Sequence, residues 1–182
     1  MIFTPTRLPG AFLVEPEPHE DERGVFLRTW CAREFAAHGL VAELAQCSVS
    51  VSRRAGTVRG LHFQRAPAEE EKLVRCTRGA IWDVIVDLRR QSPAFRQWQA
   101  FELTAESYRA LYVPKGFAHG FQTLAPDTEV SYQISAFYTP EAADGLRYDD
   151  PALAIPWPLP VSVVSQRDRS WPDLAALLAP SP

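Results

Sequence analysis

The chain has 182 residues, of which 46% are hydrophobic and 23% charged, and its formal net charge is −3. This length and composition predict one globular domain over residues 1–182 with a sizeable core. The mild negative charge gives no support for a general nucleic-acid-binding or membrane-surface role, and no run of about 18 apolar residues is present to span a bilayer.

The cysteines and the first residues bear on the cellular compartment. Three widely spaced cysteines, Cys31, Cys47 and Cys76, form neither a disulfide framework nor a zinc motif. Residues 1–7 lack the charged start and apolar run of a secretory signal. A reducing, cytoplasmic location is therefore expected.

In chain order, the first expected element is a helix over Cys31–His38, ended by Gly39. The pattern then becomes strand-like, because residues 81–88 alternate between two faces and Val130, Tyr132 and Ile134 share one face. Further expected strands are Ala45–Ser52, Lys72–Thr77, Ala100–Thr104, Ala110–Val113 and Phe121–Leu124. Many short strands at roughly even spacing favour an all-β sandwich or barrel.

Two expected elements follow the strands. The proline-rich stretch Pro151–Pro160 is expected to be an ordered excursion anchored by Trp157. A second helix is expected over Trp171–Leu178, with Ser170 as its N-cap and Asp173 near its positive end.

An antiparallel barrel of this size leaves exposed strand edges, so a homodimer is expected.

Two histidines mark the expected site. His62 lies in the run Thr57–Gln64, and His119 lies in the run Val113–Phe121. Both runs are glycine-containing and strand-like, and short strands separate them. This arrangement predicts one pocket built across a barrel.

A metal site is the first chemistry to test. Cupin barrels that bind metal usually offer two histidines and a carboxylate in the first motif, but here Gln64 stands in that motif. Only His62 and His119 remain as good donors, and the run Glu69–Glu71 is more simply a solvated loop. A metal-dependent cupin enzyme and a non-catalytic sugar-binding cupin remain alternatives, but no cofactor is expected.

Acid–base chemistry fits the residues better. The chain has no Gly-x-Ser-x-Gly, no Gly-x-Gly-x-x-Gly and no Walker loop. Histidine is the side chain best suited to proton transfer at physiological pH, so His62 is a candidate base, while Tyr132 is expected to face the barrel interior. Lys72 begins a strand and is a candidate cation for a developing oxyanion.

Many stretches in the right order resemble the dTDP-4-dehydrorhamnose 3,5-epimerase family, whose members are sugar-nucleotide epimerases. They are Asp21–Phe26, Arg59–Gln64, Lys72–Gly79, Trp82–Arg89, Ser92–Phe95, Val113–Phe121, Phe137–Pro140, Tyr148–Pro151 and Val164–Asp168. The resemblance implies a metal-free, cupin-like jelly-roll homodimer with a few short helices. It also implies epimerisation of a nucleotide-linked 4-keto-6-deoxy sugar at C3, C5 or both.

The resemblance also implies residue roles. The family's base corresponds to His62, and the aspartate paired with that base corresponds to Asp168. The family's proton donor corresponds to Tyr132, and its enolate-stabilising lysine corresponds to Lys72. The implied substrate contacts are Arg23, Phe26, Gln46, Arg59, His119 and Tyr138. The chain departs from the family pattern at Arg28, Cys47, Ser48 and Gln133.

Overall fold

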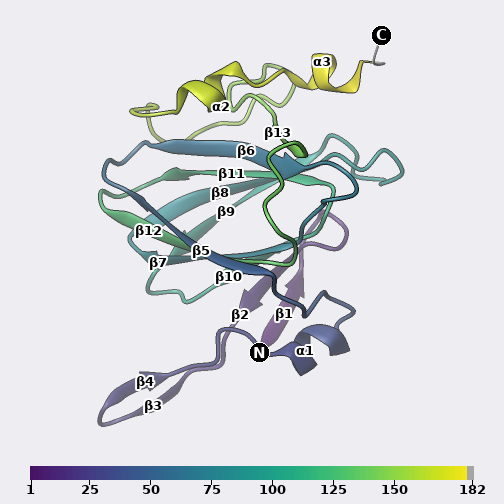
Figure 1. Cartoon of the computed structure of the whole chain (residues 1–182). Helices are drawn as coiled ribbons and strands as arrows, with labels where there is room; N and C mark the ends of the chain where they lie inside the picture. The colour runs from purple at the N-terminus through teal and green to yellow at the C-terminus, as the bar shows by residue number, and fades with distance from the viewer. Residues whose placement is uncertain (180–182) are drawn as a thin grey trace.

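The structure, a computed structural model, describes residues 1–179, which form two antiparallel sheets facing each other as a cupin-like jelly-roll barrel (Figure 1). One sheet contains, in spatial order, β1 (Ile2–Pro5), β2 (Phe12–Glu15), β10 (Ala110–Val113), β7 (Lys72–Arg78), β12 (Thr128–Ile134) and β5 (Gln46–Ser52). The other contains β13 (Ala143–Gly145), β6 (Val58–Gln64), β11 (Phe117–Thr123), β8 (Ala80–Asp87) and β9 (Trp98–Thr104). The predicted all-β class is confirmed.

The alternation of β8 places it between two apolar layers. Ile81 and Ile85 belong to the core between the sheets, whereas Val84 and Val86 pack into a second cluster on the outer face. That outer cluster includes Leu174 and other residues of the C-terminal part, which covers the five-stranded sheet in Figure 1. Burial on both faces therefore fixes β8 in the middle of the molecule.

The strand predictions are largely confirmed, with one clear shortfall. Residues 121–124 were expected as a strand, but β11 begins four residues earlier, at Phe117. Every residue of β11 is buried, so the strand shows no alternation between polar and apolar faces. A fully buried strand lacks the periodicity by which a half-exposed strand is found.

The helices give one confirmation and one correction. Helix α1 (Ala32–Ala37) is followed by Gly39 in the left-handed region, as predicted. The second prediction began too early: α2 (Gln166–Ser170) ends before Trp171, and α3 (Leu174–Leu178) begins after Asp173. Pro172 explains the break, because a residue preceding proline favours an extended backbone.

The caps of the two C-terminal helices also differ from the prediction. The Asp173 carboxylate accepts the Ala176 N–H at 2.7 Å, so Asp173 rather than Ser170 is the N-cap of α3. Trp157 lies half-buried and its indole N–H donates to the Tyr148 carbonyl at 2.8 Å, as expected for an anchor. No helix in residues 1–179 is long and apolar enough to cross a membrane.

A hairpin of β3 (His19–Asp21) and β4 (Gly24–Phe26) extends away from the barrel (Figure 1). Phe26 is 73% exposed, and all six strand residues are exposed. A two-stranded hairpin is marginally stable alone, so this one is expected to need a surface to pack on.

Candidate active site

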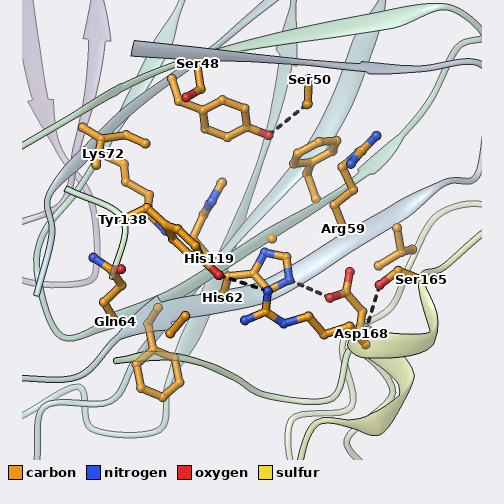
Figure 2. Close-up of a pocket in the computed structure, with 18 of the residues that line it drawn as sticks. Ser48, Ser50, Arg59, His62, Gln64, Lys72, His119, Tyr138, Ser165 and Asp168 are labelled. Carbon is orange, nitrogen blue, oxygen red and sulfur yellow. Dashed lines mark hydrogen bonds and ion pairs between the residues drawn. The ribbon is translucent and has the colours of Figure 1, made fainter. Parts of the chain in front are cut away.

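A cavity of about 580 Å³ opens between the two sheets, a size typical of small-molecule sites (Figure 2). Strands β5, β7 and β12 of one sheet, strands β6 and β11 of the other, and helix α2 all contribute side chains. The polar lining includes Gln46, Ser48, Ser50, Arg59, His62, Glu70, Lys72, His119, Tyr132, Tyr138, Arg167 and Asp168. Eight of the ten residues predicted for the site therefore lie in one cavity.

The two histidine motifs are joined by the register of β6 and β11. His62 and His119 are direct cross-strand partners, so their side chains project from the same face. Beside them the strands come unusually close, because a Cβ on Gly60 would lie only 2.5 Å from the Gly120 Cα. The glycine in each motif therefore permits the approach that brings the histidines together.

His62 is paired with a carboxylate from α2. Its Nε2 lies 2.7 Å from Asp168 Oδ1, and the Gly60 N–H donates to the other oxygen at 3.2 Å. Ser165 caps α2 by accepting the Asp168 N–H at 3.0 Å, which fixes the helix and its carboxylate. Burial alone would raise the pKa of Asp168, but these hydrogen bonds and the charge of His62 hold it below its ordinary value.

His119 has a carboxylate partner of its own. Its Nε2 lies 3.0 Å from both oxygens of Asp83, which is completely buried on β8. The His119 side chain is only 5% exposed, against 43% for His62. The second histidine is thus a fixed, buried group in the cavity wall, while the first is open to a ligand.

Tyr132 faces the cavity from β12, as its position on the Val130–Ile134 stripe predicted. Its ring packs against the core between the sheets. Its hydroxyl lies 3.1 Å from the Ser50 hydroxyl on the neighbouring strand. Burial raises the pKa of the phenol well above its ordinary value, so Tyr132 is neutral at physiological pH.

Lys72 also lines the cavity, and it is not alone there. Its Nζ lies 2.8 Å from Glu70 Oε1, and both side chains are only about one-tenth exposed. Glu71 accepts a hydrogen bond from Ser135 at 2.7 Å. The prediction of a solvated acidic loop is therefore wrong for two of its three residues, because each carboxylate has a specific partner.

Three expected substrate contacts occupy the cavity wall. The Arg59 guanidinium donates to the Ser52 hydroxyl and the Val51 carbonyl, so it is held against β5. Gln46 Oε1 accepts the Tyr138 N–H at 2.5 Å. The Tyr138 hydroxyl in turn accepts a hydrogen bond from Arg167 at 3.2 Å.

Gln64 occupies the position where a metal-binding cupin would offer a ligand. Its Nε2 donates to the carbonyls of Ala68 and Phe137, at 2.8 and 3.1 Å, and its Oε1 accepts the Thr139 N–H at 2.6 Å. The amide therefore clamps two backbone segments beside the cavity. Within residues 1–179, no group of three or more histidine, cysteine or acidic side chains is placed to hold a metal ion.

Two of the ten predicted residues, Arg23 and Phe26, do not line this chain's own cavity. Both lie on the projecting β3–β4 hairpin, where the Arg23 side chain is 85% exposed and pairs only with Asp21. Of the positions that depart from the family pattern, Ser48 lines the cavity, whereas Arg28 lies near α1 and pairs with Glu34 at 3.6 Å.

Sequence reasoning missed several residues of the site. Asp83 had a usable signal, because a carboxylate between Ile81 and Ile85 on one strand face requires a buried partner. Glu70 lies two residues before Lys72, and Arg167 directly precedes Asp168. From the sequence alone, neither can be distinguished from an ordinary surface charge. Ser50 gave no signal, because its importance depends on the register between β5 and β12.

Comparisons with known proteins agree with this geometry. The family model for dTDP-4-dehydrorhamnose 3,5-epimerase matches residues 5–176. A dTDP-4-dehydrorhamnose 3,5-epimerase from Sinorhizobium fredii is 44% identical, over 97% of this chain and 91% of the relative.

Solved structures extend the likeness to the fold. The Bacillus anthracis dTDP-4-dehydrorhamnose 3,5-epimerase, solved with TDP and PPi bound, superimposes with a TM-score of 0.92 at 43% identity, covering 95% of this chain and 99% of that one. A Legionella pneumophila epimerase in complex with dTDP-4-keto-L-rhamnose gives 0.89 at 35% identity, covering 96% and 93%. The chain therefore belongs to the dTDP-4-dehydrorhamnose 3,5-epimerase family of isomerases.

Proposed function

We propose that the protein epimerises a dTDP-linked 4-keto-6-deoxy sugar, converting a dTDP-4-dehydro-6-deoxyglucose type substrate to the 4-dehydrorhamnose type by inversion at C3 and C5. The observation that carries this proposal is one cavity in which His62, paired with Asp168 of helix α2, lies on one sheet and Tyr132 lies on the opposite sheet. The family's name and the ligands of the solved relatives support the substrate class.

The first step is removal of a proton from carbon. C3 and C5 both lie next to the C4 carbonyl, so loss of either proton gives an enolate. Asp168 is ionised near neutral pH and accepts a hydrogen bond from His62 Nε2–H, which leaves Nδ1 as the basic nitrogen. The carboxylate thereby fixes the tautomer and orientation of the His62 ring.

The second requirement is a place for the negative charge. The charge of the enolate resides on the C4 oxygen, and Lys72 supplies an ammonium group in the poorly exposed wall of the cavity. Such a cation stabilises the transition state more than the neutral ketone. Glu70 holds the ammonium group in place.

Inversion then requires a proton from the other face of the sugar ring. His62 belongs to the five-stranded sheet and Tyr132 to the six-stranded sheet, so a sugar between them meets one group on each face. Tyr132 is neutral and therefore still carries the proton it must give. We assign His62 as the base and Tyr132 as the acid.

The remaining polar residues bind and orient the substrate. Arg59 and Arg167 are cations at the cavity and suit the diphosphate, while Gln46, His119 and Tyr138 position the sugar and nucleotide. Binding energy from these distant groups serves to hold the reacting carbons near the base.

The exposed hairpin supports a homodimer. Val25 and Phe26 are both exposed on the projecting hairpin, and exposed apolar patches mark sites that a partner surface covers. If the hairpin of one subunit packs over the cavity of the other, Arg23 and Phe26 become the substrate contacts that the family pattern implies. Reciprocal packing of this kind produces a closed two-fold dimer.

The compartment follows from the thiols and the substrate. Cys31, Cys47 and Cys76 are all free, which is typical of proteins in a reducing environment. Nucleotide sugars are made from nucleoside triphosphates inside the cell, so a cytoplasmic location fits the proposed reaction.

The test is incubation with dTDP-4-keto-6-deoxyglucose in D₂O, followed by NMR at C3 and C5. Solvent deuterium is expected at both carbons, together with the inverted configuration at both. Deuterium and inversion at C3 alone would reduce the assignment to a 3-epimerase. Absence of exchange at both carbons would refute the proposed function.

A further inference from the structure

The acid assigned to the reaction lines the cavity but is only partly exposed. The Tyr132 ring packs against the apolar core between the sheets, and its hydroxyl points toward β5. Among the residues that the structure describes, Ser50 is the one side chain hydrogen-bonded to that hydroxyl, at 3.1 Å. Figure 2 shows Ser50 and its hydrogen bond on the far side of the cavity from His62 and Asp168.

The burial of the Tyr132 hydroxyl creates a difficulty for catalysis. When Tyr132 gives its proton to carbon, a phenolate remains in a site where burial disfavours charge. Arg59 is near, but its guanidinium donates to the Ser52 hydroxyl and the Val51 carbonyl. A hydroxyl that donates to the phenolate is therefore the direct means of stabilising it.

We propose that Ser50 is a positioning residue that enables Tyr132 to act as the acid, by donating a hydrogen bond to the phenolate that forms. The inference rests on the proposed function. Either hydroxyl can be the donor in this pair, so Ser50 can accept from the neutral phenol and donate after the proton has left. The register holds Ser50 ready, because Tyr132 pairs with Ser48, two residues along the same face of β5.

The proton balance of the cycle is complete. His62 takes a proton from the sugar carbon and becomes an imidazolium, and the electron pair passes to the C4 oxygen. The enolate then collapses, and the carbon takes the proton of the Tyr132 hydroxyl on its other face. Solvent water finally returns a proton to the phenolate and accepts one from His62, so Ser50 gains and loses none.

The test uses side chains of matched shape. Threonine and valine are nearly isosteric and both favour strands, but only threonine retains the hydroxyl. Ser50→Thr, Ser50→Val and Ser50→Ala are compared with wild type in D₂O with dTDP-4-keto-6-deoxyglucose. Ser131→Ala, the same truncation on the opposite face of β12, is the control.

The rates of deuterium entry and of inversion are measured by NMR in one reaction. For Ser50→Val and Ser50→Ala, deuterium should still enter the sugar at near the wild-type rate, but mainly with retained configuration. The rate of inversion should fall roughly 10- to 100-fold. Ser50→Thr should stay within a few-fold of wild type for both, and Ser131→Ala should match wild type. The ratio of inversion to exchange isolates the acid, because a loss of folded protein lowers both rates equally.

Three outcomes would overturn the inference. An unchanged ratio in Ser50→Val would show that the phenolate needs no help from this hydroxyl. An equal fall of both rates, in protein that is folded by circular dichroism, would make Ser50 a residue of substrate binding. A threonine variant as impaired as the valine variant would show that shape matters rather than the hydroxyl. Failure of wild type to exchange would instead refute the proposed function itself.

Discussion

His62 and His119 lie directly opposite each other on β6 and β11, yet different carboxylates hold their imidazoles. Asp168 reaches His62 from a helix beyond the sheet, and Asp83 reaches His119 from the adjacent strand β8. The first imidazole is partly exposed and the second almost fully buried. Two chemically identical side chains thereby have different environments, one open to the cavity and one fixed within its wall.

His62→Ala should abolish deuterium entry at both C3 and C5, because the proposed mechanism has no other base on that face. The expected loss is at least about 10²- to 10⁴-fold. Asp168→Ala should lose less, since it acts through the imidazole. NMR in D₂O measures both, and wild-type exchange in the His62 variant would show that the base is another residue.

Tyr132→Phe should separate proton removal from inversion. Phenylalanine keeps the ring and its packing but cannot give a proton, so the proton should return from His62 to the face it left. Solvent deuterium is then expected in sugar of retained configuration, with little epimer formed. Unchanged inversion would point to another acid, with Tyr138 as the next candidate.

Lys72→Met should slow exchange by roughly 10²- to 10³-fold, because the enolate loses the charge that stabilises it. The chain's other lysine, Lys115, lies exposed and outside the cavity, so Lys115→Met is a matched control that should keep wild-type rates. Single-turnover kinetics would check both variants. Equal rates in the two variants would remove Lys72 from the mechanism.

A complementation experiment tests whether the hairpin serves a partner subunit. Arg23→Ala removes a side chain of the hairpin alone, and His62→Ala removes a side chain of the cavity alone. Each variant by itself should therefore be inactive or weakly active. If the sites are shared, dissociating and re-associating an equal mixture should restore activity to about a quarter of the wild-type sites. No recovery in a verified heterodimer would mean that each hairpin does not serve the opposite cavity.

Acid should destabilise the fold through Asp87. Burial alone would raise its pKa, but hydrogen bonds from Arg89 and Ser92 outweigh burial and lower it. The stabilisation is therefore full above the unfolded-state pKa, about 3.9, and is lost as pH falls through the lower folded-state value. Urea unfolding from about pH 7 to 3 should show this loss, and Asp87→Asn should be less stable at pH 7, with a weaker dependence on acid.

The sequence predicted the parts of the fold that have a visible period or a local signal. The alternation around Ile81–Leu88 and the glycine after α1 correctly indicated a central strand and a helix end. The prediction for β11 was too short at its start, because the strand is buried on both faces and shows no alternation. The last helix begins later than predicted, at Leu174, because Pro172 favours an extended backbone at Trp171.

The site divides in a similar way. Residues in glycine-rich motifs, such as His62 and His119, could be found from the sequence because the motif is local. Ser50 could not, since it acquires its partner only through the pairing of β5 with β12, two strands distant in sequence. The location of Arg23 on a projecting hairpin was also unpredictable, because a short exposed strand has no hydrophobic pattern.

Gln64 restricts how this barrel can change during evolution. Its amide uses both of its functions at once, donating to two carbonyls and accepting one backbone N–H. A glutamate there would offer a metal ligand but no donor, so the carbonyls of Ala68 and Phe137 would lose their partner. The segment that carries Tyr138 would keep the hydrogen bond from the Thr139 N–H but lose the one that Phe137 accepts. A change to a metal-ligating glutamate at this one position would thus remove two hydrogen bonds from the wall of the substrate cavity.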